Sequence, residues 1–220
     1  MPIFFQHQIN ETTRLGIWKI EETEDFFLGT VPLQREVTHP HKRLQHLAGR
    51  FLLQFLYPGF PYELIEIADT RKPYLPNEQY QFSISHCADF AAAIVSKNQR
   101  VGVDIEVISD RIHRVAYKFL SQSEQNFLNR DDKLFLRQWG IEEKVETEFL
   151  TLIWNAKESI FKWYGNGGVD FSQQIQLDGD ILFNDQDWIT MPFIFSKEKE
   201  YTLHVHARLM NQLTLAWVMS

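Results

Sequence analysis

Two segments that lie far apart in the chain constrain its fold, because together they place three acidic residues in largely apolar surroundings. Residues 101–106 read Val-Gly-Val-Asp-Ile-Glu, the alternation typical of a strand. Successive side chains of a strand point to opposite faces, so Asp104 and Glu106 share one face and lie about 7 Å apart. Residues 154–165 form an aromatic helical segment that contains Glu158. These two elements together supply three carboxylates.

The three carboxylates suit a hard divalent cation. Mg²⁺ prefers oxygen ligands, keeps several of its waters and binds phosphates through one or two carboxylates, so a third acid from the helix would complete such a site. Mn²⁺ suits the same oxygen ligands. Without the helix, Asp104 and Glu106 are also typical of the polar face of an edge strand, and that alternative stays open.

The helical segment carries two lysines with different expected roles. Lys162 lies four residues after Glu158 and therefore on the same helix face, close to Trp154 and Phe161. A pair with this spacing is often a surface feature, but here bulky apolar side chains surround it. Lys157 is expected to be solvated or to make a secondary contact with a phosphate.

Composition and charge exclude several classes of protein. The net charge of −7 over 220 residues argues against a general nucleic-acid binder, which needs a basic face. The single cysteine, Cys87, excludes an intramolecular disulfide and a thiolate zinc site, and suits a reducing cytosol. No apolar run has the length of a signal sequence or a membrane span. We expect a cytoplasmic protein that does not span a membrane.

Hydrophobic periodicity predicts an α/β protein of the α+β type with two similar halves. Leucines, phenylalanines and an alanine recur every three or four residues across 40–57, which predicts a long helix ended by Pro58-Gly59. A second long helix is expected across 148–164. Strands are expected near 3–5, 16–20, 64–67, 81–85, 90–95, 101–107, 174–177, 188–195, 201–206 and 213–218, a short helix start at 21–25, and further helices across 112–129 and 133–138. The polar segment 97–100 suggests a division into residues 1–100 and 101–220.

A third cluster ends one of the expected strands. Residues 82–86 read Phe-Ser-Ile-Ser-His, so Ser85 and His86 stand at a strand end that can present both side chains to a ligand. Histidine and serine are hydrogen-bond donors that suit a phosphate, although a lone histidine is often structural. No nucleophile-elbow pattern surrounds either serine, so a hydrolase reading rests on adjacency alone.

Two cations precede a proline in the segment Arg71-Lys72-Pro73. Proline fixes its own backbone and keeps the preceding residue extended, so the turn can present Lys72 rigidly. The alternative is an ordinary solvated loop.

These four segments, in this order, resemble the 4′-phosphopantetheinyl transferase superfamily, and specifically its larger two-subdomain, surfactin-synthetase-activating (Sfp) type. The family pattern is Gly-Lys-Pro, then Asn-x-Ser-His, then x-Gly-x-Asp-x-Glu, then Trp-Ser-x-Lys-Glu-Ser/Ala-x-x-Lys, where x is often hydrophobic. It looks like residues 71–73, 83–86, 101–106 and 154–162 here. The last two segments are the most specific.

Three residues depart from the family pattern. Arg71 stands where the family usually has Gly, Ser83 where Asn is common, and Asn155 where Ser, Thr or Cys is usual. None of the three removes a charged group from the expected site.

The resemblance implies transfer of the 4′-phosphopantetheine arm from coenzyme A to a serine of an acyl or peptidyl carrier protein, which leaves 3′,5′-ADP. By similarity, Asp104, Glu106 and Glu158 would hold Mg²⁺ on the pyrophosphate of coenzyme A. Lys162 would sit against the same pyrophosphate. Glu158 is the best candidate to accept the serine proton, directly or through a water.

The resemblance also implies a cradle for coenzyme A. Its nucleotide and 3′-phosphate would contact Lys72, Pro73, Ser85 and His86, beside Asp104 and Lys162 at the pyrophosphate. Arg43 would add a phosphate contact from the first long helix, and Arg50 is the alternative. The expected fold is two subdomains with a pseudo-twofold relation, each a small sheet packed on a long helix, with coenzyme A at their junction.

A carrier protein would need a local docking patch, because carriers and this chain are both acidic. Residues 108–128 include Arg111, Arg114 and Lys118 and form a plausible patch, with a solvated helix as the alternative. The family expectation is a monomer. Two other functions stay open: a metal-dependent phosphoesterase or nuclease, which the missing basic surface disfavours, and a non-catalytic module that binds carrier proteins.

Overall fold

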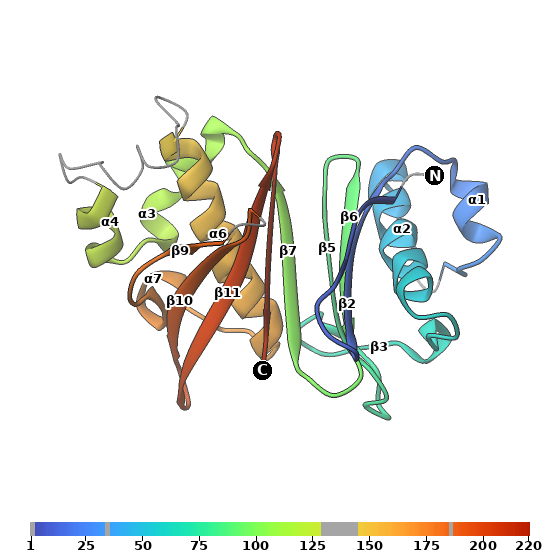
Figure 1. Cartoon of the computed structure of the whole chain (residues 1–220). Coiled ribbons are helices and arrows are strands. Elements are labelled where there is room, and N and C mark those ends of the chain that lie inside the picture. Colours follow the sequence, from blue (N-terminus) through green and yellow to red (C-terminus); the bar gives the residue numbers. More distant parts are fainter. Residues whose placement is uncertain (1–2, 34–35, 129–144, 185–186) are drawn as a thin grey trace.

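The computed structural model describes residues 3–33, 36–128, 145–184 and 187–220. Two antiparallel sheets pack against each other, and each is covered on its outer face by one long helix. In Figure 1 the strands β5 (Gln81–Cys87) and β7 (Val101–Val107) lie side by side in the middle of the molecule, between α2 and α6. The mixed α/β class with antiparallel sheets is confirmed.

The first sheet has the strand order β1-β2-β6-β5 and carries the helix α2. Its elements are β1 (Ile3–Gln8), β2 (Thr13–Lys19), β5, β6 (Phe90–Ser96), α1 (Glu24–Leu28) and α2 (Pro40–Leu56). A short 3-10 helix η1 (Tyr62–Leu64) follows α2, and a hairpin of β3 (Glu66–Ile67) and β4 (Pro73–Tyr74) precedes β5.

The second sheet has the order β7-β12-β11-β10-β8, with β9 beside β10, and carries the helix α6. Its strands are β7, β8 (Ile175–Leu177), β9 (Leu182–Phe183), β10 (Ile189–Ser196), β11 (Glu200–Met210) and β12 (Leu213–Met219). Its helices are η2 (Asp110–Arg114), α3 (Ala116–Phe119), α4 (Gln122–Leu128), α6 (Val145–Tyr164) and α7 (Phe171–Gln174).

The two sheets and the two long helices form four layers, and side-chain alternation along the strands determines which layers pack together. In β6, Ala91, Ala93 and Val95 pack toward α2, whereas Ala92 and Ile94 pack toward the second sheet. The sheets meet through a buried apolar cluster that β2, β6, β7 and β12 all supply. The division into residues 1–100 and 101–220, and a pseudo-twofold relation between the halves, stay predictions.

The helical stretch expected across 112–129 is divided into η2, α3 and α4. Leu120 is extended and ends α3, and a new helix begins after Ser121. The Ser121 hydroxyl accepts from the N–H of Glu124 at 3.2 Å, and the Glu124 carboxylate accepts from the N–H of Ser121 at 2.7 Å. This is a capping box, whose Ser-x-x-Glu spacing is present in the sequence. The helix expected at 133–138 lies outside the described residues.

The strand β7 and the helix α6 approach each other most closely at Gly102. A Cβ atom at this position would lie 2.0 Å from the carbonyl oxygen of Ser159 and 2.7 Å from the backbone nitrogen of Trp163. Both neighbours are main-chain atoms of a helix, which cannot rotate away. Glycine at this position therefore lets α6 lie directly on β7.

We expect Gly102→Ala to destabilise the protein by about 3 kcal/mol or more, because the added methyl group must push the helix off the strand. Gly29→Ala is the matched control, since a Cβ atom there would meet its nearest neighbours at 3.5 Å and the backbone has ordinary helical angles. Urea unfolding of the two variants measures the difference. Equal stability of both variants would show that the β7–α6 contact is not tight.

Candidate active site at the junction of the two sheets

A buried carboxylate, Asp104, is the centre of the candidate site. Its side chain projects from β7 toward α6 and is 4% exposed. The ammonium group of Lys162 on α6 donates to Asp104 Oδ1 at 2.5 Å, and the Ser85 hydroxyl on β5 donates to the same oxygen at 2.7 Å. The other oxygen, Oδ2, is buried and has no hydrogen-bond partner within the described parts of the chain.

The charge of Asp104 affects the pKa values of two further carboxylates, Glu106 and Glu158. Burial, and then the negative charge of Asp104, raise the pKa of Glu106 to about 7. The same two causes raise the pKa of Glu158 to about 7, against the opposite effect of Lys162. A hydrogen bond with Trp154 acts to lower the pKa of Glu106. Negative charges on the three acids are therefore mutually unfavourable, and Lys162 compensates them only in part.

The donor set fits a hard divalent cation, although it is not a preformed cage. Within the described ranges, no three His, Cys, Asp or Glu side chains converge closely enough to count as a metal centre. The unpartnered oxygen of Asp104 and the mutual repulsion of the three carboxylates are nevertheless features that a cation such as Mg²⁺ would relieve. The three acids predicted as metal ligands thus interact electrostatically, and their role as ligands stays a prediction.

Two serines of β5 join the edges of the two sheets. The hydroxyl of Ser83 accepts from the backbone N–H of Val103 at 3.2 Å, and Ser85 bonds to Asp104 as described. Strand β7 pairs with β12 along one edge, so these serines occupy its other edge. The sequence had suggested a ligand role for Ser85, but no role for Ser83 as a link between strands.

A cationic cavity of about 230 Å³ lies beside Lys162, lined also by Arg71, Lys72 and Pro73. Burial, and then the charge of Arg100, lower the pKa of Lys72 to about 8. Of the residues predicted to cradle the nucleotide, Lys72 and Pro73 line this cavity together with Lys162, whereas Ser85 and His86 are not among its lining residues.

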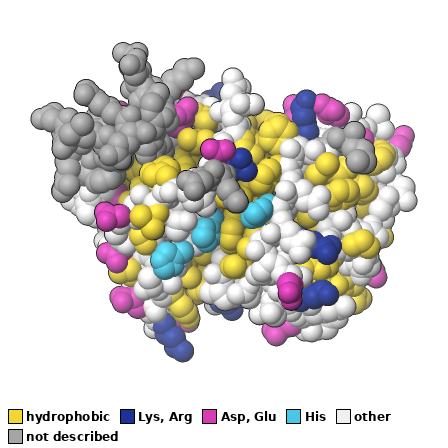
Figure 2. All heavy atoms as spheres, viewed as in Figure 1, with side chains coloured by type: hydrophobic (Ala, Val, Ile, Leu, Met, Phe, Trp, Pro, Cys, Tyr) yellow, Lys and Arg dark blue, Asp and Glu magenta, His cyan; other side chains and the backbone are white. Residues whose placement is uncertain are grey.

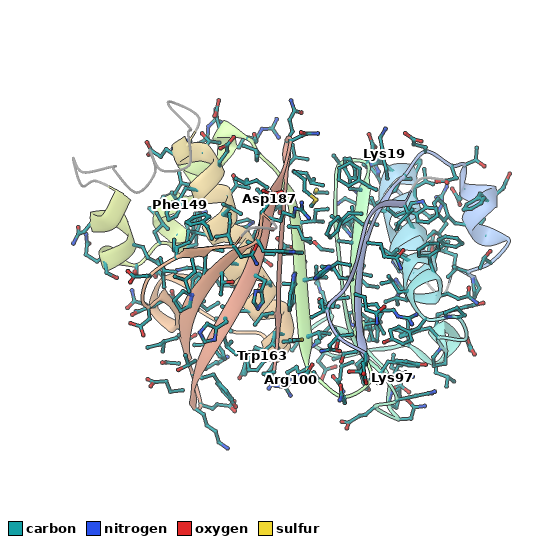
Figure 3. All side chains as sticks on the ribbon, in the orientation of Figure 1. Lys19, Lys97, Arg100, Phe149, Trp163 and Asp187 are labelled. Carbon is teal, nitrogen blue, oxygen red and sulfur yellow. The ribbon has the colours of Figure 1, made fainter. Side chains whose placement is uncertain are left out.

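The hairpin turn that carries Lys72 is fastened to the C-terminal end of α6. The ammonium group of Lys72 donates to the carbonyl oxygen of Trp163 at 3.3 Å, and the Thr70 hydroxyl donates to that of Gly165 at 2.8 Å. Arg100 stacks over the Trp163 ring, with its guanidinium carbon 5.4 Å from the ring centre, and both side chains lie at the lower end of the molecule in Figure 3. Lys72 is thus held near the carbonyl end of the helix, where a positive charge is favoured.

Arg71 has a φ angle of 68°, in the left-handed region that favours glycine. Its N–H donates to the carbonyl of Ala68 at 2.8 Å within the turn. The usual glycine of the family would adopt this conformation without strain, so the turn geometry is compatible with the family pattern despite the arginine.

His86 is the next-to-last residue of β5, one residue before the strand ends at Cys87, and it is exposed. Loss of hydration around the ring lowers its pKa, and the nearby positive charges of Lys162 and Lys42 act in the same direction. The negative charge of Asp104 acts in the opposite direction, so charges of both signs act on this strand end.

The two arginines proposed for phosphate contact have other partners. Arg43 Nε donates to Glu24 on α1 at 2.6 Å, and one terminal nitrogen donates to the carbonyl of Val37 at 3.0 Å. Arg50 is buried beside His46, whose Nδ1 lies 3.1 Å away. Neither arginine is among the groups around Asp104, and the choice between them stays open.

The prediction that Lys157 is solvated was wrong. Its side chain is fully buried, and its ammonium group donates to Glu124 at 2.7 Å and to the carbonyls of Phe119 and Phe171 at 2.7 and 3.1 Å. Glu124 also accepts from the N–H of Leu177 at 2.9 Å. The lysine uses all three donors to connect α3, α4, α6 and α7, so it serves the fold and not a phosphate.

Two further grooves are lined by the carboxylates Glu106 and Glu158. One, of about 500 Å³, is lined by Glu106, Cys87 and Trp154. The other, of about 770 Å³, is lined by Glu158, Phe171 and again Trp154. Trp154 therefore lines both grooves, as Val115 also does, a role that the sequence did not indicate.

The surface agrees with the acidic composition. On the face seen in Figure 2, basic and acidic side chains are scattered, and no broad basic patch is visible. In the part of the chain that the structure describes, no helix is both long enough and apolar enough to cross a membrane.

We expect Lys157→Met to destabilise the protein by about 3–5 kcal/mol, because the variant leaves the charge of Glu124 buried without its partner. The double variant Lys157→Met/Glu124→Gln should recover part of this loss, since no charge then stays buried. Lys118→Met is a control at an exposed lysine. Thermal unfolding measures the stability of these variants. A Lys157→Met variant as stable as the control would refute the structural role of Lys157.

Comparison with known proteins gives the family. The model of the 4′-phosphopantetheinyl transferase superfamily matches residues 100–217. Enterobactin synthase component D of Escherichia coli O157:H7 is 30% identical over 161 residues, which are 72% of this chain and 68% of that protein. The 4′-phosphopantetheinyl transferase AcpT of the same strain is 27% identical over 138 residues, which are 60% of this chain and 64% of that protein.

The span that the family model matches is more than half of the chain, and it contains both the carboxylate strand β7 and the helix α6. It therefore includes Asp104, Glu106, Glu158 and Lys162. The chain belongs to the 4′-phosphopantetheinyl transferase superfamily.

Proposed function

We propose that this protein transfers the 4′-phosphopantetheine group of coenzyme A to a serine hydroxyl of an acyl or peptidyl carrier protein and releases 3′,5′-ADP. The observation that carries the proposal is the position of Asp104. This buried carboxylate lies between Lys162 and two further acids, next to a cavity lined by cations. A pyrophosphate with a divalent cation matches this distribution of charge.

The cationic cavity is the proposed site of the nucleotide and its 3′-phosphate. Lys72 and Pro73 line it, and Lys162 reaches from it to Asp104. Ser85 and His86 stand beside Asp104 at the end of β5. This placement puts the pyrophosphate against Lys162, and Arg43 or Arg50 would add a contact from α2.

Asp104, through its unpartnered oxygen, together with Glu106 and Glu158 would hold Mg²⁺ or Mn²⁺. The ion would supply positive charge to the pyrophosphate, where negative charge builds as the leaving phosphate departs. Lys162 would supply a second positive charge on the protein side.

In the reaction, the serine oxygen forms a bond to the phosphorus that bears the pantetheine. The bond from this phosphorus to the bridging oxygen breaks, and 3′,5′-ADP leaves with the electron pair. The serine proton must pass to a base, and Glu158 is our candidate. Before a cation binds, burial and the charge of Asp104 raise the pKa of Glu158 to about 7, and a bound cation would act in the opposite direction.

The carrier protein would dock beside the grooves around Trp154. Arg111, Arg114 and Lys118 are exposed on η2 and α3, next to these grooves, and give a local positive patch on an acidic protein. One relative is named as a component of enterobactin synthase, so a carrier protein of such a synthase is a natural acceptor to test beside acyl carrier protein. We expect the protein to act as a monomer in the cytoplasm.

We expect the mass of an apo carrier protein to rise by about 340 Da after incubation with this protein, coenzyme A and Mg²⁺, a covalent modification. A chelator should prevent the gain. Asp104→Ala and Glu106→Ala should lose transfer and keep the fold, because they remove cation ligands, and Lys162→Ala should lower turnover more than stability. Intact-mass spectrometry and thermal unfolding of the same samples measure both effects.

The two other functions give different results in the same assay. Coenzyme A binding without transfer to any of several carriers would support a carrier-binding module. No coenzyme A binding at all would favour a phosphoesterase, and family membership already argues against that reading. Full transfer by the three variants would show that the residues are assigned wrongly.

We expect the affinity for coenzyme A to fall as the pH rises through about 8, because Lys72 then loses its positive charge. The sign follows from the direction of the shift: burial lowers the pKa, so the neutral lysine appears within the accessible pH range. Lys72→Met should bind coenzyme A weakly at pH 7 and lose this pH dependence.

Titration calorimetry with chelator present measures these affinities, with Lys19→Met, at an exposed lysine on β2, as the control. Dephospho-coenzyme A lacks the 3′-phosphate, so its affinity should change little in the Lys72→Met variant. An equal loss for both ligands would place Lys72 away from the 3′-phosphate.

A further inference from the structure

A chain of buried hydrogen bonds connects α6 to the main chain of Glu106. Asn155 on α6 is fully buried, and its Nδ2 donates to the Thr214 hydroxyl on β12 at 2.7 Å. Thr214 is also fully buried, and its hydroxyl donates to the carbonyl oxygen of Glu106 on β7 at 3.3 Å. Three elements of the second half are thereby joined at one point.

The direction of these bonds follows from the chemistry of the groups. A threonine hydroxyl has one hydrogen, and the carbonyl of Glu106 can only accept, so the hydrogen of Thr214 points to Glu106. The amide of Asn155 must then donate to Thr214. Among the described residues this orientation leaves Asn155 Oδ1 buried without a partner, which is unfavourable.

The chain of hydrogen bonds from Asn155 through Thr214 to Glu106, called the relay below, lies next to the carboxylates. Asn155 precedes Glu158 by three residues on α6, so the two side chains lie on neighbouring parts of one helix face. Thr214 stands opposite Glu106 in the β12–β7 ladder. The relay therefore links the turn of α6 that carries one acid to the residue of β7 that carries another.

We propose that Asn155, acting through Thr214, is a positioning residue that holds Glu106 at a set distance from Glu158 so that both carboxylates can bind one divalent cation. The proposal rests on the function proposed above. Groups behind the ligands of a metal site commonly orient them, and their loss lowers metal affinity about 10–100-fold. The unsatisfied amide oxygen is the cost of using an asparagine for this connection.

The test is the Mn²⁺ affinity of the variants Asn155→Ala and Thr214→Val. The electron paramagnetic resonance signal of the free ion measures this affinity. Both variants should bind Mn²⁺ at least tenfold more weakly than the unmodified protein, and the double variant no more weakly than either single one, because each breaks the same relay. Thr214→Ser keeps the hydroxyl and should retain the affinity.

A matched control exists in the first sheet. The hydroxyls of Thr13 and Ser96 form a buried hydrogen bond of 2.8 Å between β2 and β6. Thr13→Val also removes one buried hydroxyl, so it should lower the melting temperature and leave Mn²⁺ affinity unchanged. If Asn155→Ala fails to fold, Thr214→Val and Thr214→Ser decide, since valine has nearly the shape of threonine.

Mn²⁺ affinities of Thr214→Val and Asn155→Ala within twofold of the unmodified protein would overturn the positioning role and leave the cation site standing. Absence of Mn²⁺ binding by the unmodified protein would instead overturn the cation site itself, and with it this role. In transfer assays, the expected pattern is a higher Mg²⁺ requirement with little change in turnover at saturating Mg²⁺.

Discussion

The buried charge of Asp104 is the constraint on which the rest of the site depends. A carboxylate at this depth needs hydrogen bonds and an opposite charge. Lys162 from α6 and Ser85 from β5 provide both, but only to one of its oxygens. The helix must therefore lie directly on the strand, and the absent side chain of Gly102 permits this. The second oxygen is buried without a hydrogen-bond partner in the described part of the chain, and the charge of Asp104 acts on both Glu106 and Glu158.

The two lysines of α6 have different roles: Lys157 stabilises the fold, and Lys162 belongs to the proposed site. Lys157 uses every donor on groups of the protein, so it connects the surrounding helices and has no capacity left for a ligand. Lys162 donates to Asp104 and lines the cationic cavity. Five residues of spacing place the two ammonium groups on different sides of the helix, one in the apolar core and one at the junction of the sheets.

Local patterns predicted what depends on local geometry. Alternation placed Asp104 and Glu106 on one face, and the bounds of the strand at 101–107 agree with the structure. The burial of Lys157 could not be predicted in this way, because its partner Glu124 lies 33 residues earlier and its other two acceptors are main-chain carbonyls. The break at Leu120 was predictable from the capping box that begins at Ser121, which the periodicity had obscured. The assignment of the catalytic and cofactor-binding residues remains a prediction.

The three departures from the family pattern share one physical explanation. Each of the three residues either adopts a required backbone angle or forms a hydrogen bond that leads to a main-chain group of β7. Arg71 adopts the left-handed angles of the turn that glycine would adopt freely. Ser83 accepts from the N–H of Val103 at the open edge of β7. Asn155 reaches Thr214, and through it the carbonyl of Glu106. Because the charged groups are held by this main-chain framework, the neighbouring positions can vary while the carboxylates keep their arrangement.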